Sequence, residues 1–520
     1  MMKKVSVWVA CCCLFFFIET SAQNKLLNSP MRKLQLAEFA ISKLYVDSVN
    51  ESDLVEHAII GMLKELDPHS TYSTPEEVKK INEPLQGKFD GVGIQFNMVK
   101  DTLFVIQPIS GGPAEKAGIL PGDRIVAIND TIVAGVQMGT DEIMYRLRGK
   151  RGTKVQVDIL RKDIKELLPI TIKRDRIPVV SLDAHYMVND SIGYIRINRF
   201  SLTTSKEFLT ALKDLQQQGM QALILDLQGN GGGYLNAAIE IAEQFLNRDQ
   251  LIVYTIGRKN PRTDFQAKGK GLLKEGKLII LIDEYSASAS EIVTGALQDW
   301  DRAMVVGRRS FGKGLVQRPI NLPDGSMIRL TVARYYTPAG RCIQKPYGIE
   351  TPYEEDLANR YNRGEMLHAD SIHFPDSLKY YTLKKKRPVY GGGGIMPDYF
   401  VPIDTTLHSG YYSRLRDRGA LIQWNIKQIE ESREKWLDMY TNFSDFATQF
   451  EITPTMLDEL KEIGTTLNIP FDEKQYQKSL PLIRIQLKAL LARDLWGMNE
   501  YFQIANQLNT SMQKAIELLK

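Results

Sequence analysis

The stretch that decides the fold consists of Leu278-Ile-Ile-Leu-Ile282, then Tyr285-Ser-Ala-Ser-Ala-Ser290 and Phe311-Gly-Lys-Gly-Leu-Val-Gln317. The short apolar run predicts a buried strand, and the serines follow in the turn into a helix that ends near Trp300. A second strand and a glycine-flanked lysine come next. A hydroxyl with a nearby amine is the composition of a nucleophile with its base, so this stretch predicts the reactive part of a hydrolase.

Strands and helices alternate on both sides of this stretch. We predict strands at 192–197, 222–226, 278–282 and 304–306, and helices at 205–217, 234–246 and 290–300. This alternation predicts an α/β core with a largely parallel sheet, which we place at 175–402. Residues 347–390 are polar and aromatic, and we expect an irregular insertion or lid there.

The chain of 520 residues is too long for one hydrophobic core, so we expect a multidomain α/β protein. Its net charge of +4 gives no electrostatic footprint for nucleic acid, and we expect none as a partner. Zinc signatures with paired cysteines or a His-Glu-x-x-His motif are missing from the sequence, so no metal is expected.

The first residues have the pattern of a secretory signal peptide. Lys3 and Lys4 precede an apolar run at 5–18, and Thr20-Ser-Ala22 follows as a small-residue cleavage site. The run is too short to span a bilayer. We therefore predict a signal peptide at 1–22 and export to the periplasm or cell envelope. Acylation of one of Cys11, Cys12 and Cys13, as in a lipoprotein, is the alternative.

Helical spacing of apolar residues dominates both ends of the mature chain. In the N-terminal helical region, 23–85, two helices between 33 and 66 are expected to pack as a small bundle. Ser73-Thr-Pro75 then predicts a capped helix start. The C-terminal region, 403–520, predicts a helical support domain, because it gathers no set of reactive groups.

Residues 86–174 combine short alternating strands with glycine turns. The run from Gly112 to Ile125 and the loop Gly91-Val-Gly-Ile94 resemble those of a PDZ domain. In such a domain the backbone N–H groups of a glycine loop hold a carboxylate, and the strand after it pairs with a peptide. We therefore expect Gly91, Val92, Gly93 and Ile94 to bind a protein C-terminus, although glycines before a strand also form ordinary turns.

Two other signatures fail on inspection, and a third stays open. Gly307 to Lys313 starts like a phosphate-binding P-loop, but Gly314 stands where Ser or Thr is needed, and a β-like sequence follows in place of a helix. The run from Gly229 to Gly233 follows a strand as a dinucleotide loop would, but Tyr234 replaces the third glycine. His185 leaves a serine–histidine pair open without supporting it.

Spacing alone does not choose among the serines. Ser288 stands three residues before Glu291, which is a capping box, and Ser286 or Ser290 could also cap the helix. Capping and catalysis both remain open at this point. We expect Lys313 to be buried, which would lower its pKa and make it a base. Gln317 lies an even number of residues further on and would share its face of a strand.

The motifs together resemble the carboxy-terminal processing (tail-specific) serine peptidases. They are the segments 226–233 (Asp-Leu-Gln-Gly-Asn-Gly-Gly-Gly), 286–292, 311–317 and 336–341, with the PDZ-like region before them. The resemblance implies a crotonase- or Clp-peptidase-like core, with Ser288 as nucleophile, Lys313 as base and Gln317 orienting it. It also implies an oxyanion hole from the amides of Ala289 and Gly232 or an adjacent glycine, a structural Asp299, and no cofactor.

One residue departs from the family pattern. Gln228 stands where the family commonly has arginine, so a contact supplied by that arginine is in doubt. We expect an exported endopeptidase that captures protein C-terminal tails and cleaves through an acyl-enzyme. The alternative is an inactive tail-binding scaffold, or a carrier of apolar ligands, on the same core.

Overall fold

The computed structural model describes residues 29–99, 101–109, 111–162, 164–348 and 353–520. The signal peptide expected at 1–22 lies outside these residues. The chain forms two compact units, Met1–Val78 with Gln317–Thr331, and Lys79–Val316 with Val332–Lys520. Each unit is described separately below.

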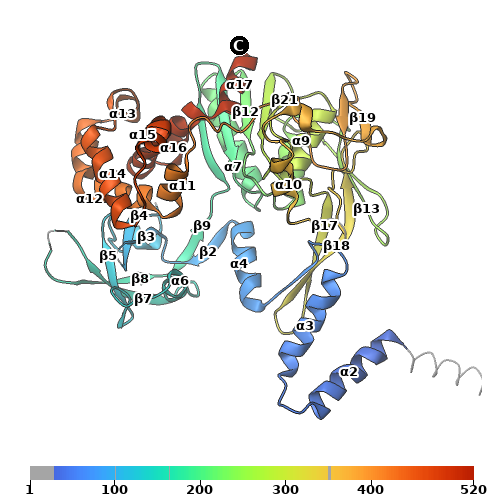
Figure 1. Cartoon of the computed structure of the whole chain (residues 1–520), viewed down its shortest axis with the longest axis horizontal. Helices are drawn as coiled ribbons and strands as arrows, with labels where there is room; N and C mark the ends of the chain where they lie inside the picture. The colour runs from blue at the N-terminus through green and yellow to red at the C-terminus, as the bar shows by residue number, and fades with distance from the viewer. Residues whose placement is uncertain (1–28, 100, 110, 163, 349–352) are drawn as a thin grey trace, which may run out of the picture. The chain divides into compact units, whose positions relative to one another are not determined.

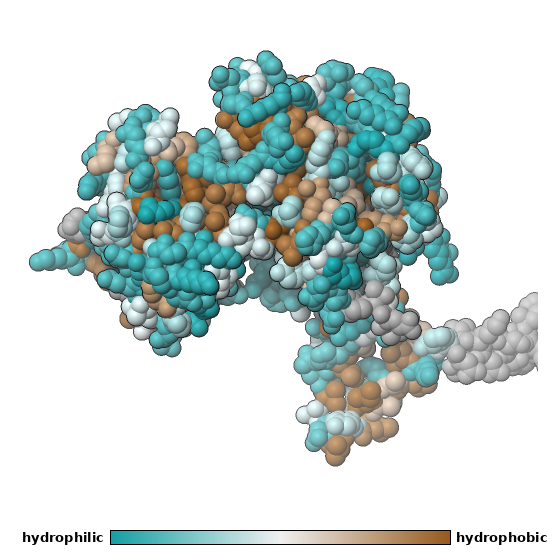
Figure 2. Space-filling model, turned by 45° about the horizontal axis from the view of Figure 1, so that its top comes forward, coloured by the Kyte–Doolittle hydropathy of each residue, from teal (hydrophilic) through white to brown (hydrophobic). Residues whose placement is uncertain are grey.

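The first unit contains the two predicted N-terminal helices, α2 (Pro30–Leu44) and α3 (Glu51–Lys64). The two helices contact each other but share no buried core among the residues that the structure describes, since α2 has no buried residue and α3 buries only Leu63. Apolar side chains of α2 such as Phe39 are exposed. Figure 2 shows hydrophobic surface in the region of the N-terminal helices. The spacing of apolar residues predicts that a helix has one apolar face, but it does not predict which surface packs against that face.

A short strand and a tight turn complete the first unit. β1 (Thr71–Ser73) pairs antiparallel with the start of β18 (Met327–Tyr336). In the turn before β1, Asp67 accepts the N–H groups of His69 and Ser70 at 2.8 and 3.0 Å. The predicted cap at Thr74 is confirmed, since Thr74 and Glu77 exchange side-chain to backbone hydrogen bonds at the start of α4 (Pro75–Gln86).

The second unit begins with the β-rich region expected from the sequence. Its sheet has the order β3-β4-β5-β7-β8, with β6 paired to β5. The short strands predicted for residues 86–174 are confirmed. The elements are β2 (Lys88–Gly91), β3 (Ile94–Val99), β4 (Thr102–Pro108), α5 (Pro113–Lys116), β5 (Arg124–Ile128), β6 (Thr131–Ile132), α6 (Thr140–Leu147), β7 (Lys154–Leu160), β8 (Leu168–Lys173) and β9 (Asp175–Pro178).

A six-stranded sheet forms the α/β core, in the order β10-β11-β12-β15-β16-β21. Figure 1 labels its strands β12 and β21. All neighbours from β11 to β21 are parallel, and only β10 runs antiparallel. The strands are β10 (Leu182–Met187), β11 (Ile192–Ile197), β12 (Ala222–Asp226), β15 (Lys277–Ile282), β16 (Met304–Gly307) and β21 (Tyr399–Phe400). The predicted parallel sheet is therefore confirmed.

Alternate residues of these strands face two different layers. Leu223, Leu225, Ile280 and their equivalents pack with the helices α7 (Thr204–Gln217), α8 (Leu235–Glu243) and α9 (Ala289–Asp299). The intervening residues, such as Ile224 and Ile279, pack with the last helix, α17 (Thr510–Leu519). Helices therefore cover both faces, which is why every strand residue of β12 is buried.

Antiparallel strands and an ordered insertion complete the core region. β13 (Leu251–Ile256) pairs with β14 (Thr263–Gln266) and with β18, while β17 (Leu315–Asn321) also pairs with β18. The expectation of an irregular 347–390 segment is wrong in part. This segment holds α10 (Asp356–Asn362), the short helices η1 (Ala369–Ser371) and η2 (Asp376–Leu378), and a hairpin of β19 (Lys379–Tyr381) and β20 (Pro388–Tyr390).

The C-terminal part is helical, as predicted, around an aromatic core that includes the fully buried Trp424. No helix in the described part of the chain is both long and apolar enough to cross a bilayer. The helices are α11 (Gly410–Asp417), α12 (Ala420–Met439), α13 (Phe443–Gln449), α14 (Pro454–Thr466), α15 (Glu473–Leu495), α16 (Met498–Ala505), η3 (Asn506–Leu508) and α17.

Candidate active site

Three neighbouring parallel strands deliver the candidate residues to one edge of the sheet. β12, β15 and β16 are adjacent strands. Their carboxyl ends lead, in that order, into the glycine run (residues 227–233), the serine turn (285–290) and the lysine loop (309–313). Parallel strands present their carboxyl ends at the same edge, where α/β proteins place their sites. This topology explains how segments distant in sequence meet.

The structure distinguishes the three serines that the sequence left open. Ser286 and Ser290 are fully buried and donate hydrogen bonds to the carbonyl oxygens of Leu227 and Asn230, at 2.8 and 2.9 Å. Both hydroxyls therefore join the serine turn to the glycine run. Ser288 is the only partly exposed serine of the three.

Ser288 also has an unusual backbone conformation. Its φ of 55° and ψ of −110° place a non-glycine residue outside the common regions at the start of α9. Such a conformation costs of order 1–3 kcal/mol and persists only where the surroundings enforce it, typically at functional sites. It is the sharp strand-to-helix turn expected for an exposed nucleophile.

Gly232 lies directly against this turn. Its φ is 99°, and a Cβ at this position would lie 2.7 Å from the carbonyl oxygen of Ala287 and 2.9 Å from the nitrogen of Ala289. Only glycine fits so close an approach. The predicted pair, Gly232 and Ala289, is therefore adjacent. The Gly232 N–H donates to Asn230 Oδ1 at 2.8 Å, whereas Ala289 is the first residue of α9, whose N–H has no helical acceptor.

The buried carboxylate of Glu291 connects the serine turn to the lysine loop. Glu291 accepts the backbone N–H of Ser288 at 2.8 Å, of Gly312 at 2.7 Å and of Lys313 at 2.9 Å. The Ser310 hydroxyl donates to the same carboxylate. Burial raises the pKa of Glu291 to about 7, although these four donors favour its ionised form.

Tyr335 makes a second connection between the two segments. Its hydroxyl lies 3.1 Å from the carbonyl oxygen of Ser288 and also contacts that of Lys313. The ring is 1% exposed, and burial raises the pKa of the phenol well above its usual range. Tyr335 therefore remains a neutral donor near neutral pH.

Two expectations about Lys313 need correction. Lys313 is partly exposed, not buried. It also precedes β17, which begins at Leu315, so the alternation of a strand does not relate it to Gln317. The backbone of Lys313 is nevertheless held on both sides, by Glu291 and Tyr335.

Gln317 belongs to the first compact unit and has a defined partner there. Its side-chain Nε2 donates to Thr331 Oγ1 at 3.3 Å. Thr331 Oγ1 in turn donates to the carboxylate of Asp67 at 3.0 Å. This short chain of hydrogen bonds fixes the orientation of the Gln317 amide within its unit.

An arginine of the neighbouring strand bonds to position 228, where the family pattern has arginine. Asp226 is fully buried and pairs with Arg196 Nη1 of β11, while the Tyr194 hydroxyl donates to it at 2.6 Å. Arg196 Nη2 also donates to the Gln228 carbonyl at 2.8 Å. Gln228 accepts a hydrogen bond from Asn509 at 2.9 Å, which connects the strand end to the C-terminal segment.

The other candidates from the sequence have structural partners. Asp299 is fully buried and pairs with the equally buried Arg341, as expected for a structural residue. His185 lies 3.3 Å from Asp214 through its Nε2 atom, and its backbone N–H donates to Asn499. These contacts give no support to a serine–histidine pair.

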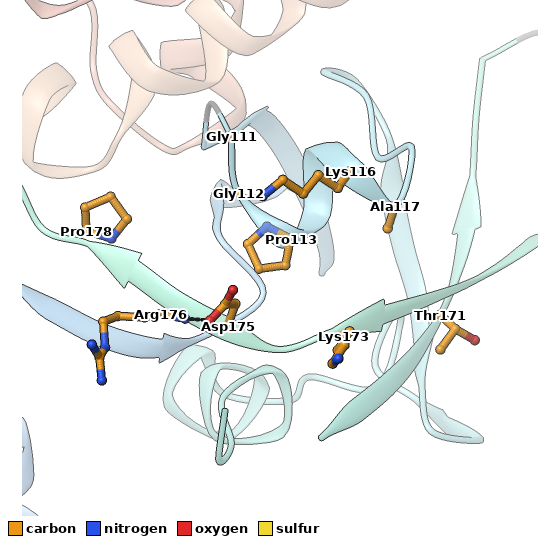
Figure 3. A pocket seen from close by; sticks show the side chains of 10 residues that line it. All are labelled: Gly111, Gly112, Pro113, Lys116, Ala117, Thr171, Lys173, Asp175, Arg176 and Pro178. Atoms are coloured by element: carbon orange, nitrogen blue, oxygen red, sulfur yellow. Dashed lines mark hydrogen bonds between the residues drawn. The ribbon is translucent and has the colours of Figure 1, made fainter. Parts of the chain in front are cut away.

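The predicted peptide-binding loop precedes a free sheet edge. Gly93 has a φ of 76°, and among the described residues β3, which follows it, pairs with β4 alone and is an edge strand. An edge strand offers unpaired N–H and C=O groups to a peptide. A separate pocket in the same region lies beside the start of α5 and is shown in Figure 3. It is lined by Gly111, Gly112, Pro113, Lys116, Ala117, Thr171, Lys173, Asp175, Arg176 and Pro178.

Four known protein families match separate segments of the chain. Residues 191–354 match peptidase family S41, residues 91–172 a PDZ domain, and residues 18–77 the N-terminal domain of the activating protease CtpB. Residues 411–497 match a family of unknown function. The fold and these matches define the class as a peptidase of family S41 that carries a PDZ domain.

Relatives identify the family more closely. The chain is 39% identical over 418 residues to a carboxy-terminal-processing protease of Bartonella bacilliformis, covering 78% of this chain and 93% of that protein. It is 36% identical over 326 residues to the carboxy-terminal processing protease CtpB of Bacillus subtilis, covering 62% and 67%. The solved photosystem II D1 C-terminal processing protease is 25% identical, covering 74% and 89%, with a TM-score of 0.38. The chain belongs to the carboxy-terminal processing proteases.

This membership confirms the family resemblance and the expected fold class. Sequence reasoning did not find Tyr335 or the second role of Glu291. The capping-box spacing was a signal for Glu291, but only the fold shows that its carboxylate also reaches the lysine loop.

Proposed function

We propose that this protein is an exported serine endopeptidase that cleaves peptide bonds through a Ser288–Lys313 dyad. The observation that carries the proposal is the pair of buried side chains, Glu291 and Tyr335, that hold the backbones of both residues. Ser288 is the partly exposed serine on a strained turn, and its two neighbours are engaged in buried hydrogen bonds.

In the proposed mechanism Lys313 removes the proton of the Ser288 hydroxyl as Oγ attacks the scissile carbonyl carbon. The tetrahedral oxyanion is stabilised by the N–H of Ala289 and an amide of the adjacent glycine run, at Gly232 or Gly233. Lys313 then protonates the leaving amine, and water hydrolyses the acyl-enzyme by the same steps in reverse order. Gln317 is proposed to orient the lysine amine. No step requires a metal or an organic cofactor.

The glycine run supplies its amide in one of two ways. The Gly232 N–H is bonded to Asn230 Oδ1, so either Gly233 serves as the second donor or Asn230 moves when substrate binds. The Ala289 N–H requires no change, because it opens a helix whose dipole favours an anion at this end. In both arrangements the oxyanion receives one amide from the glycine run after β12 and one from the serine turn after β15.

The PDZ domain is proposed to select the substrate. A peptide C-terminus would place its carboxylate at the loop from Gly91 to Ile94 and pair with the free edge of β3. The substrate class is therefore proteins with an accessible, unstructured C-terminal tail. Export is proposed from the sequence at 1–22 alone.

Covalent labelling tests the nucleophile. A fluorophosphonate probe should modify wild-type protein on Ser288, as located by peptide mass spectrometry. Ser286→Ala should still be labelled and Ser288→Ala should not. Labelling of a different residue would reject Ser288. Tail binding without labelling or hydrolysis would favour the alternative function, an inactive scaffold.

A further inference from the structure

A helical segment beyond the S41 match lies against the lysine loop. The match to family S41 ends at residue 354, and the α10 segment, which we define as residues 355–365, follows directly. The lysine loop comprises residues 309–313. Contacts between these two segments have no part in the mechanism proposed above.

The side chain of Arg360 in α10 binds the backbone of the lysine loop. Its Nη1 and Nη2 atoms donate to the carbonyl oxygens of Ser310 and Arg309, at 3.1 and 2.6 Å. Arg360 is 1% exposed, so the whole guanidinium is removed from water to make these contacts. Burial lowers its pKa to about 10, which still leaves it charged at neutral pH. The planar fork of an arginine suits two successive carbonyl groups.

Glu365 supplies the counter-charge at the end of the segment. It pairs with Arg309 of the lysine loop, and its Oε2 atom lies 3.6 Å from Arg360 Nε. Glu365 is 8% exposed. The buried carboxylate of Glu365 therefore pairs with Arg309 of the loop and with Arg360 of the α10 segment.

A second contact is made one helical turn earlier. Asp356 pairs with Lys345 Nζ at 3.2 Å, and this ammonium lies 4.0 Å from the centre of the Phe311 ring in the lysine loop. The backbone N–H of Lys345 donates to the Gly312 carbonyl at 2.9 Å. Asp356 and Arg360, at i and i+4, thus act on the loop from one face of the helix.

The opposite side of the loop is bonded to the serine turn. The Phe311 N–H donates to the Ser286 carbonyl at 3.0 Å, and Glu291 accepts the N–H groups of Gly312 and Lys313. We propose that the α10 segment is a clamp that holds the lysine loop against the serine turn, with Arg360 as a positioning residue for Lys313. This inference rests on the proposed function, in which Lys313 is the base.

The expected effect follows from the precision that proton transfer requires. A displacement of about 1 Å in a catalytic group can lower a rate about 10²-fold. Arg360→Met keeps the length of the side chain but removes its donors. We expect it to lower kcat about ten- to a hundredfold with KM changed by less than about twofold, because the buried Arg360 bonds to the backbone of the lysine loop.

The experiment compares four full-length proteins: wild type, Arg360→Met, Arg360→Lys and Tyr361→Ala. Hydrolysis of a tail peptide gives kcat and KM, and hydrogen-exchange mass spectrometry follows the amides of residues 311–313. Arg360→Lys retains a charge and one donor and should recover part of kcat. Tyr361 is 50% exposed on the same helix, and its variant should match wild type. If Arg360→Met does not fold, Asp356→Asn replaces it as a milder change and should also lower kcat.

Two results overturn the clamp. They are a wild-type kcat in Arg360→Met, and unchanged exchange of residues 311–313 in that variant. Failure of the proposed function gives a different result, namely hydrolysis that persists in Ser288→Ala. In that case faster exchange in Arg360→Met still supports the clamp, and unchanged exchange rejects it.

Discussion

The carboxylate of Glu291 accepts the backbone N–H of Ser288 at 2.8 Å. The same carboxylate accepts the N–H groups of Gly312 and Lys313, and it is 1% exposed. One side chain therefore caps the helix that begins after Ser288 and fixes the loop that carries the proposed base. The relative position of Ser288 and Lys313 depends on a buried group that can change its charge.

Glu291 should make the stability of the protein depend on pH. Burial raises its pKa from 4.5 to about 7, so its contribution is fully present below pH 4.5 and is lost as pH rises through 7. The shift corresponds to about 3 kcal/mol. Urea unfolding gives the free energy of unfolding of wild type and of Glu291→Gln at pH 4.5 and 8. Relative to the variant, wild type should lose about this amount of stability between the two pH values. A difference that is independent of pH would contradict this explanation, and Glu240→Gln, on the exposed side of α8, is the control.

The three serines should separate stability from activity. Ser286→Ala and Ser290→Ala each remove a buried hydroxyl that bonds a carbonyl of the glycine run, and should lower the free energy of unfolding by about 1–3 kcal/mol. Both should retain measurable turnover. Ser288→Ala should abolish turnover with little change in stability. Melting temperature and kcat, measured on all three, check this; turnover by Ser288→Ala would reject the assignment.

Gly232→Ala should impair the oxyanion site. The new Cβ would lie 2.7 Å from the Ala287 carbonyl oxygen, at a backbone φ of 99° that alanine rarely adopts. The turn that carries Ser288 and Ala289 must then move, and we expect kcat to fall about 10²–10³-fold, the cost of losing an oxyanion donor. Gly231→Ala is the matched control, because its Cβ would have no atom within 4 Å. Equal kcat values for the two variants would contradict the prediction.

Arg196 should be essential for the stability of the glycine run. Arg196→Met would leave the carboxylate of Asp226 buried without its cation, at a cost of about 3–5 kcal/mol. Adding Asp226→Asn to that variant should recover part of the loss, because the buried charge is removed with its partner. Urea unfolding of the two single variants and the double variant measures the coupling. Additive effects would show that Arg196 and Asp226 are not coupled and would contradict the prediction.

The sequence predicted the core strands well because they are apolar runs buried on both faces. Ile192–Ile197 and Ala222–Asp226 were placed at their observed bounds for this reason. The serine turn was also located, since a capping residue precedes α9 at the expected spacing. Local pattern carries this information without any tertiary contact.

Tertiary contacts determined what the sequence could not show. The exposure of Lys313 depends on which side chains cover it, and the apolar face of α2 finds no cover in its unit. The helix within the 347–390 segment owes its order to the ion pairs and hydrogen bonds of Asp356 and Arg360 with residues elsewhere in the chain. None of these partners lies within a few residues in sequence, so no local pattern reports them.

Hydrolysis of a peptide with an apolar C-terminal tail, by wild type, Ser288→Ala and Lys313→Ala in parallel, tests the central claim most directly. The account predicts turnover by wild type and no measurable turnover by either variant, with all three proteins folded by circular dichroism and binding the tail equally. Equal hydrolysis by the three proteins would contradict the Ser288–Lys313 dyad.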